Sequence, residues 1–554
     1  MFFRIKPSGR RSYVQIVENR WEDGKSRQKV LLTVGRLDEL HESGQLDALL
    51  ESGGRLAESL LVLSAHRRSE TTLVATKRIG PVLVFERLWR QSGCQAIVEE
   101  LAGERRFGFS LERAIFLTVL HRLMTSGSDR SAMRWKDSYR IDGVGPIALH
   151  QLYRAMAFLG DELPEDEQAG ATPFSPRCVK DRLEEQIFLE RRDLFTDLDL
   201  VFFDTTSIYF EGEGGETIGQ RGHSKDHRPD LKQMIVGAVL DGDGRPVCCE
   251  MWPGNTTDVK SLIPVAERLK QRFGVSRVCV VADRGMISHE TIEELERLKF
   301  DYILGARMRT WAEVRDDVLT RPGRYREIVP ARTKTKDPSP LKVKEVLTDS
   351  GRFIVCLNEE QARKDAHDRQ AILETLREKL SHGGKELVGN KGFRKYLKSE
   401  KAMFQIDANK VTQEARYDGK WVLATNTSLS AEDVAGKYKQ LWMVEQVFRS
   451  MKSLLSTRPI FHKCDETIRG HVFCSFLALV LRKELQDRLL HVGIELEWED
   501  LIRDLDALQE IDVSNGNGTL FRLRTTAQGC AGKVLKAVGV AMPATIRKVE
   551  GTTA

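Results

Sequence analysis

Residues 198–210, LDLVFFDTTSIYF, are the stretch on which the fold prediction rests. They are rich in β-branched and aromatic side chains, which is typical of a strand buried on both faces. Within this run, Asp204 directly follows the apolar residues VFF at 201–203. A carboxylate in a buried strand loses its hydration, and this costs free energy unless the group binds something positive. We therefore predict a central strand that carries a functional acid.

The residues that follow this strand predict a mixed sheet. Residues 234–240 and 246–252 indicate two more strands, and the sequence DGDG at 241–244 supplies a tight turn between them. Helical and strand-like runs then alternate at 259–273, 277–282, 288–299 and 302–306. An antiparallel meander followed by this alternation is typical of an α/β domain with a mixed sheet.

Patterns on either side of this core divide the chain into further regions. Residues 12–35 predict a β-hairpin, and apolar residues at three- and four-residue spacing predict a mainly helical region after it. Short strand-like runs interrupt the α/β rhythm after residue 311, and long helices follow at 431–455 and 467–490. The predicted regions are a basic hairpin at 1–37, a helical region at 38–197, the α/β domain at 198–310 and 421–492, a β-rich insertion at 311–420, and a small C-terminal segment at 493–554.

Charge is unevenly distributed along the 554 residues. The chain has 86 Lys and Arg against 81 Asp and Glu, a net charge of +5, yet residues 1–36 alone hold nine basic residues against three acids. Residues 385–401 hold six against two. Basic clusters on a nearly balanced chain favour a polyanion as the partner, and a solvated charged surface is the alternative.

Other patterns exclude several classes of protein. The longest apolar run, within 472–481, is far shorter than the roughly 20 residues of a membrane span, and the N-terminus shows no signal peptide. We therefore expect a cytoplasmic protein with no membrane partner. Nine dispersed cysteines without a CxxC pair indicate reduced thiols. The glycine-rich runs lack the lysine of a P-loop, so no nucleotide cofactor is expected.

Two more acids join Asp204 as candidate functional residues. Asp283 directly follows the apolar run VVA at 280–282, and Glu445 lies within the predicted helix 431–455. A carboxylate at the C-terminal end of a buried strand is a common active-site position in α/β proteins. Because carboxylate oxygens are the ligands that Mg²⁺ prefers, the three acids together predict a divalent metal site.

The predicted helix 431–455 carries a polar stripe around its acid. Tyr438, Glu445 and Lys452 are seven residues apart, close to two helical turns, and Arg449 follows Glu445 by four. At this spacing all four side chains would share one face. Such phenolic and cationic groups could contact DNA phosphates. An ordinary amphipathic surface helix is the alternative interpretation of this stripe taken by itself.

These motifs together resemble those of DDE insertion-sequence transposases. The closest group is the insertion-sequence-four superfamily, in its sixteen-thirty-four branch, which is known for the signature Tyr-x2-Arg-x3-Glu-x6-Lys. Leu441 stands where this signature has Arg, and Arg449 is the residue on the same helix that could replace the charge. The similar segments are DTTS at 204–207, VADRG at 281–285, the spaced Tyr438, Glu445 and Lys452, GHSKDHRPD at 222–230, PGNTTD at 253–258, RPIFH at 458–462 and VGRL at 34–37.

This resemblance implies an RNase H-like catalytic domain, interrupted by the β-rich insertion, with Asp204, Asp283 and Glu445 as catalytic ligands of two Mg²⁺ ions, for which Mn²⁺ can substitute. It implies hydrolysis at the inverted-repeat ends of a mobile element and attack of the freed 3′-hydroxyl on target DNA. The implied partners are double-stranded DNA, which the region 38–197 would help to recognise, and a second copy of the chain in a synaptic complex. The expected location is the nucleoid of a bacterial cytoplasm. The residues expected to contact DNA are Tyr438, Arg449, Lys452, Arg284, Lys225 and Arg228.

Two alternative functions stay open at this point. One is a catalytically inactive, transposase-derived DNA-binding protein, for which Leu441 leaves room. The other is a stand-alone RNase H-like nuclease that cuts without end specificity and makes no strand-transfer product.

Two further residue groups have a structural interpretation. Asp258 precedes the predicted helix 259–273, so we interpret it as a helix N-cap rather than a metal ligand. A set of four residues has the composition of a zinc site, but part of it falls in or beside an apolar helical stretch, which favours a core role. This set is His462, Cys464, His471 and Cys474.

Overall fold

The computed structural model forms two compact units. Residues 1–84, 137–141 and 492–554 make the first unit, and residues 85–136 and 142–491 make the second. The turn of the predicted hairpin at 23–24 and part of the basic run at 385–401 lie outside the described residues. The structure describes residues 1–9, 11–22, 25–50, 52–53, 56, 71–103, 105–125, 127–169, 171, 175–191, 200–274, 278–330, 338–381, 391–400, 403–454, 457–515 and 518–549.

The predicted N-terminal hairpin is present, and a third strand extends it. β2 (Arg11–Glu22) and β3 (Lys25–Arg36) pair antiparallel, and β1 (Phe2–Ser8) pairs with the other edge of β2. Helix α1 (Leu37–Glu42) follows and buries Leu40. Most other side chains of this sheet are exposed, so its basic residues face solvent.

A second sheet of the first unit joins strands from both ends of the chain. Its order is β18-β17-β16-β4, and every pair is antiparallel. Residues 72–78, which the sequence pattern placed in the helical region, thus form a strand beside the C-terminal segment. The elements are β4 (Thr72–Arg78), α17 (Trp498–Asp506), β16 (Gln509–Ser514), β17 (Leu520–Arg524), α18 (Ala531–Val538) and β18 (Ile546–Lys548).

Helices fill most of residues 80–191, in agreement with the apolar spacing of the sequence. Gly93 lies between the first two of these helices and adopts a left-handed backbone with φ +78°, which ends the first helix. Among the described residues, no helix is long and apolar enough to cross a membrane. The helices are α3 (Gly80–Gln91), α4 (Cys94–Gly103), α5 (Leu111–Met124), α6 (Asp129–Trp135), α7 (Leu149–Gly160) and α8 (Val179–Arg191).

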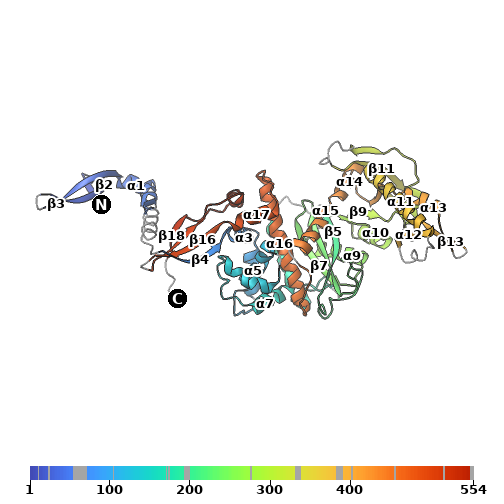
Figure 1. Cartoon of the computed structure of the whole chain (residues 1–554), viewed down its shortest axis with the longest axis horizontal. Helices are drawn as coiled ribbons and strands as arrows, with labels where there is room; N and C mark the ends of the chain where they lie inside the picture. Colours follow the sequence, from blue (N-terminus) through green and yellow to red (C-terminus); the bar gives the residue numbers. More distant parts are fainter. Residues whose placement is uncertain are drawn as a thin grey trace. The chain divides into compact units, whose positions relative to one another are not determined.

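A nine-stranded mixed sheet lies in the second unit (Figure 1). Its strands are β5 (Leu200–Tyr209), β6 (Gln233–Asp241), β7 (Pro246–Pro253), β8 (Cys279–Ala282), β9 (Asp301–Ala306), β10 (Arg326–Val329), β11 (Leu341–Thr348), β12 (Gly351–Leu357) and β15 (Lys420–Thr425). Their order is β10-β11-β12-β15-β9-β8-β5-β6-β7, and β8 is parallel to both β5 and β9. The mixed α/β prediction is confirmed, and the sheet is consistent with an RNase H-like fold.

Side chains along β5 alternate between a face of the sheet that packs in the hydrophobic core and a face that holds Asp204. Val201 and Phe203 share one hydrophobic core with residues of α9 (Asp258–Phe273) and α10 (His289–Arg297). Because neighbouring side chains of a strand point to opposite faces, Asp204 belongs to the other face. Helices α14 (Ala431–Lys439) and α15 (Trp442–Arg449) pack there: α14 contacts β8 and β9, and α15 contacts β5 and β6.

Residues 311–420 both extend this sheet and form a small satellite. β10, β11 and β12 hydrogen-bond into the sheet next to β15. The remainder packs around a separate core of Leu373, Leu376, Tyr396 and Leu397. Its elements are α11 (Glu359–Ser381), α12 (Lys391–Arg394), β13 (Leu397–Glu400), β14 (Met403–Ile406) and α13 (Ala408–Ala415), and a π-helical turn at Val314–Val318 opens the region.

Candidate active site

Strand register places two of the predicted acids side by side. β5 and β8 run parallel with Phe203 opposite Ala282. The next residue on each strand is an acid, Asp204 on β5 and Asp283 just past the end of β8. Because the two strands are adjacent and parallel, residues that follow a paired position lie side by side. The negative charge of Asp283 also contributes to the raised pKa of Asp204. Two acids that are 79 residues apart in sequence are therefore neighbours in space.

The environment of Asp204 disfavours its charged form. Its side chain is partly buried and accepts a hydrogen bond from the backbone N–H of Thr205 at 2.7 Å. Burial, with smaller contributions from the charges of Asp283 and Asp258, raises the pKa of Asp204 from 3.8 to about 6, against the opposing effects of Lys225 and of this hydrogen bond. A divalent cation beside Asp204 would favour the charged carboxylate, and carboxylate oxygens suit Mg²⁺.

Asp258 belongs to this site, and its interpretation as a helix cap is wrong. Thr257 is the residue before α9, and no side-chain hydrogen bond caps the helix there. The Asp258 carboxylate instead accepts a hydrogen bond from Thr205 Oγ1 at 2.6 Å. Sequence reasoning missed this residue because an acid at a helix start is common. The family-like segment PGNTTD at 253–258 was the signal that pointed to it.

Lys225 lies inside the site rather than on an open surface. Its Nζ is 3.1 Å from Asp258 Oδ2, and it donates hydrogen bonds to Thr205 O at 2.8 Å and Thr205 Oγ1 at 2.9 Å. Lys225 thus neutralises Asp258 and fixes the residue that follows Asp204. Its predicted role as a DNA contact requires that it exchange these partners for a phosphate.

Tyr438 reaches the site from α14. Its hydroxyl donates a hydrogen bond to Asp283 Oδ1 at 3.0 Å. Gly305 of β9 makes this approach possible, because a Cβ at that position would collide with the Tyr438 hydroxyl. Burial and the charge of Asp283 raise the pKa of Tyr438, so the phenol stays protonated and remains a donor. Tyr438 therefore orients Asp283 in this structure.

The predicted helix 431–455 is divided into α14, α15 and a π-helical turn at Ser450–Leu454. At the first junction Leu441 N donates to Tyr438 O, and Val444 N donates to Leu441 O, which closes tight three-residue turns. These turns change the rotation per residue, so a single straight helix does not relate Tyr438 to Lys452. Leu441 is only 7% exposed, so the position of the signature Arg is buried.

Glu445 lies on a helix, α15, that packs against the strand of Asp204. The residue is exposed there. Within the described part of the chain, Asp204, Asp283 and Glu445 do not bring one oxygen each within 4.8 Å of one another. The role of Glu445 as the third metal ligand stays a prediction.

Lys452 is held by an acid on the loop between β5 and β6. Its Nζ and Arg458 Nη1 both lie 2.7 Å from Asp226 Oδ1, and the Asp226 side chain is only 5% exposed. Burial lowers the pKa of Lys452. The guanidinium groups of Arg458 and Arg228 each lie over the ring of Tyr209, 5.7 and 5.6 Å from its centroid. This cluster sets basic side chains beside the end of β5.

The remaining candidate DNA contacts are more open. Arg449 is exposed on α15, and Arg284 is exposed beside Asp283. Arg228 is paired with Asp230 at 2.9 Å on the surface. Exposed arginines of this kind can reach a phosphate at little desolvation cost, so all three stay predictions.

Two segments of the chain match models of known protein families. A family model described as "Transposase DDE domain" matches residues 196–481 of the 554. Another, "IS1634 family transposase, N-terminal domain", matches residues 3–64. A search of curated proteins found no match.

One similar solved structure is the "Cryo-EM structure of piggyBac transposase synaptic complex with hairpin DNA (SNHP)", at 10% identity over 76% of each chain and a TM-score of 0.35. A likeness this weak carries no argument about mechanism. The first model spans the segment that holds Asp204, Asp283 and Glu445, and the second spans most of the basic N-terminal sheet. The N-terminal segment is similar to the N-terminal domain of IS1634 family transposases. The chain belongs to the DDE transposases.

Proposed function

We propose that this transposase cuts DNA at the inverted-repeat ends of its element and joins the freed 3′-hydroxyl to target DNA. The observation that supports this most directly is the pairing of Asp204 and Asp283 across parallel strands. DDE transposases act on DNA and generally use divalent metal ions, and a strand-borne pair of carboxylates is a suitable place for them. We propose Asp204, Asp283 and Glu445 as the catalytic set.

The donor chemistry of the site fits Mg²⁺. Asp204 and Asp283 offer hard oxygen ligands, and burial raises the pKa of Asp204, so a cation at this place would favour its charged form. We propose that these two residues, with Glu445, hold two Mg²⁺ ions and that Mn²⁺ can substitute. When bound, the ions stabilise charge on the attacking and leaving oxygens of a phosphodiester.

Residues around the two aspartates orient their carboxylates. Tyr438 donates to one oxygen of Asp283 and so leaves the other free for a ligand. Lys225 pairs with Asp258, and its charge also favours the charged form of Asp204. We propose that Asp258 and Lys225 position the Thr205 backbone, and through it Asp204, rather than touching the substrate.

DNA would be held by basic groups around the carboxylates and at the N-terminus. Arg449, Arg284 and Arg228 are exposed or close to solvent and suit phosphate contacts, while Tyr438 and Lys225 would contact DNA only by exchanging present partners. Lys452 could release Asp226 to Arg458, which already shares the same oxygen. The N-terminal sheet and the helices of region 38–197 would recognise the terminal repeats. Synapsis of two ends would use two copies of the chain.

The decisive experiment uses the purified full chain and labelled duplexes that carry the DNA flanking its coding region. We expect end-specific cleavage and a joined product in Mg²⁺ or Mn²⁺, and neither product in EDTA or with Asp283→Ala. A duplex with scrambled ends is the matched substrate control. Binding without cleavage in either ion would instead support the inactive DNA-binding relative, and Leu441 would be the first residue to test. Cleavage of both duplexes without joining would support a stand-alone nuclease.

A further inference from the structure

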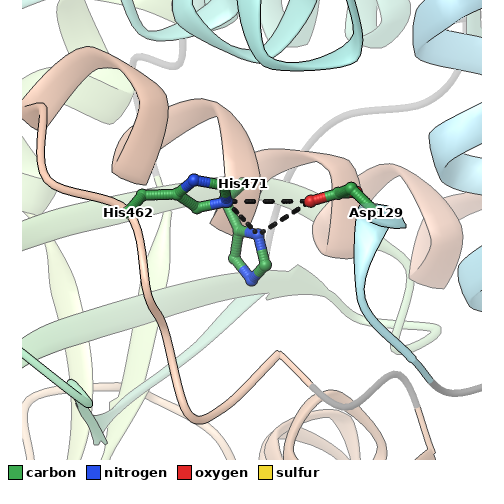
Figure 2. A group of neighbouring side chains, drawn as sticks. All are labelled: Asp129, His462 and His471. Atoms are coloured by element: carbon green, nitrogen blue, oxygen red, sulfur yellow. Dashed lines mark hydrogen bonds and ion pairs between the residues drawn. The ribbon is translucent and has the colours of Figure 1, made fainter. Parts of the chain in front are cut away.

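A polar cluster lies away from the carboxylate site, where α6, α16 (Asp465–His491) and the segment before α16 meet. Figure 2 shows Asp129, His462 and His471 with their side chains pointing toward one another. His462 Nε2 and His471 Nδ1 are 3.1 Å apart, and Asp129 Oδ2 is 3.7 and 3.9 Å from them. The three side chains are 7–15% exposed, so the cluster is nearly buried.

The hydrogen bonds of His471 define its tautomer. Its Nε2 lies 3.1 Å from the carbonyl oxygen of Thr457, which can only accept, so Nε2 carries the hydrogen. Its Nδ1 lies 2.9 Å from Arg122 Nη2, which can only donate, so Nδ1 is an acceptor and the ring is neutral. Its Nδ1 lone pair therefore points into the cluster. Metal-binding histidines have this arrangement, with the second ring nitrogen fixed by a carbonyl or carboxylate.

The distances between the three atoms suit one small ion. Zinc binds histidine nitrogen and carboxylate oxygen at about 2.0–2.2 Å, which sets tetrahedral ligand atoms about 3.4 Å apart. The observed separations of 3.1, 3.7 and 3.9 Å bracket this value. Two imidazoles and one carboxylate are ligands typical of divalent first-row transition metals. We propose that Asp129, His462 and His471 bind a divalent transition ion of the zinc type.

Arg122 is the competitor for this site. Its Nη2 lies 2.9 Å from His471 Nδ1 and 3.7 Å from Asp129 Oδ1, while its Nη1 donates to Ser475 Oγ at 2.6 Å. A bound ion would take the Nδ1 lone pair, and Nη2 would keep Asp129 Oδ1 as its partner. The ion must therefore displace the hydrogen bond between Arg122 Nη2 and His471 Nδ1, whereas the hydrogen bond from Arg122 Nη1 to Ser475 is unaffected.

The position of the cluster suggests what the ion would do. Two residues before His462, Ile460 accepts a hydrogen bond from Glu211 N at 3.0 Å and donates one to Tyr209 O at 3.3 Å, at the end of β5. The ion would thus join the helical region to the segment that supports the strand of Asp204. We infer a structural ion, distinct from the catalytic ions of the proposed function.

The test is Co²⁺ and Zn²⁺ binding by the full chain in the double variant Asp204→Asn, Asp283→Asn, which lacks two candidate catalytic ligands. We expect one Co²⁺ per chain with the visible absorption of a tetrahedral site. Adding His462→Gln should weaken binding by more than the roughly 10–100-fold that loss of a supporting hydrogen bond causes. His150→Gln, at an exposed histidine, is the matched control and should bind as its parent does.

Thermal denaturation supplies an independent measurement on the same proteins. Zn²⁺ at 100 times its Kd should stabilise the parent by about 2.7 kcal/mol and leave the His462→Gln protein unchanged. Two results would overturn the proposal: no Co²⁺ or Zn²⁺ binding by the double variant, or the same Co²⁺ spectrum and stoichiometry with and without His462→Gln. In either case Asp129, His462 and His471 would form a hydrogen-bonded cluster and no metal site. Because catalysis is removed in both proteins, neither result depends on whether the chain cleaves DNA.

Discussion

Two groups of acids in the second unit differ in burial and in the bases beside them. In the interface of α8, α9 and β7, Arg272 contacts Asp181 at 3.1 Å, Glu184 at 2.7 Å and Glu250 at 3.1 Å. Lys180 and Arg268 supply two more bases to this cluster. The carboxylate site instead holds Asp204, Asp258 and Asp283, and Lys225 pairs with Asp258.

This difference separates a structural cluster from a binding site. In the first cluster three bases face the three buried acids and hold the helices to the sheet, although burial still raises the pKa of Glu184. In the carboxylate site Asp204 and Asp283 share a face while Lys225 pairs with Asp258, and a cation can bind between two such carboxylates. Composition alone does not distinguish these cases, because both clusters use the same residue types.

The largest expected effect is loss of cleavage by Asp283→Asn. The amide keeps the shape but removes the charge, which would cost several kcal/mol of transition-state stabilisation, or roughly 10³-fold in rate. Single-turnover cleavage of the terminal duplex measures this, and a binding assay should show unchanged affinity. Asp316→Asn, at an exposed aspartate paired with Arg315, is the matched control. Cleavage within tenfold of the parent would remove Asp283 from the catalytic set.

The balanced cluster should respond in stability rather than in chemistry. Arg272→Met leaves Asp181, Glu184 and Glu250 short of a base and should cost about 3–5 kcal/mol. Urea denaturation measures this, with Arg297→Met as the control, because Arg297 pairs with Glu294 on the surface. A loss below about 1 kcal/mol would mean that this cluster does not hold the interface together.

The raised pKa of Asp204 predicts how its stability contribution depends on pH. Between its ordinary value of 3.8 and about 6 the folded chain holds a proton that the unfolded chain releases. Stability should therefore fall as pH rises from 4 to 6, by at most about 3 kcal/mol, and Asp204→Asn should remove this fall. Tm measured from pH 4 to 8 in EDTA tests it. Parallel curves for the two proteins would contradict the assigned environment of Asp204.

Tyr438→Phe should have a smaller effect on cleavage. It removes one hydrogen bond to a charged partner, worth about 1.5–3 kcal/mol, so we expect a roughly tenfold to hundredfold slower reaction with unchanged DNA affinity. Tyr302→Phe is the matched control, since its hydroxyl donates to Glu296 at 3.0 Å, away from the aspartates. Equal rates for the two variants would show that Tyr438 does not orient Asp283.

The smallest expected effect belongs to Arg449→Gln. An exposed phosphate contact should change affinity a few-fold and lower the salt dependence of binding by about one charge. Titration of the terminal duplex at several salt concentrations measures this slope, and Arg503→Gln in the first unit is the control. An unchanged slope would exclude Arg449 as the replacement for the signature Arg.

Local patterns were sufficient for much of this fold. The apolar runs around residues 201, 235 and 280 predicted strands of a mixed sheet, because strands buried on both faces require such side chains. The same patterns marked Asp204 and Asp283, since a carboxylate at the end of an apolar run stands out. They also predicted the N-terminal hairpin, but not its third strand β1, whose side chains are mostly exposed and therefore leave a weak signal.

Other features depended on contacts between distant segments. β4 pairs with β16, which is more than 400 residues later, and β10–β12 join a sheet whose parallel strands precede them. No local pattern specifies such a partner. The split between α14 and α15 likewise falls at Leu441, which is buried and is not a helix-breaking residue, so no local pattern marked it.

The sequence by itself determined that this chain carries two aspartates on strands, a glutamate on a helix and the motifs of its family, because each of these depends on a short stretch of consecutive residues. The tertiary structure decided which of these residues lie close together. The register of β5 and β8 joins Asp204 to Asp283, and α9 delivers Asp258 to Thr205 and Lys225. It also brought His462 and His471 to Asp129 rather than to a cysteine. Proximity between residues far apart in sequence follows from packing, and packing is a property of the whole unit.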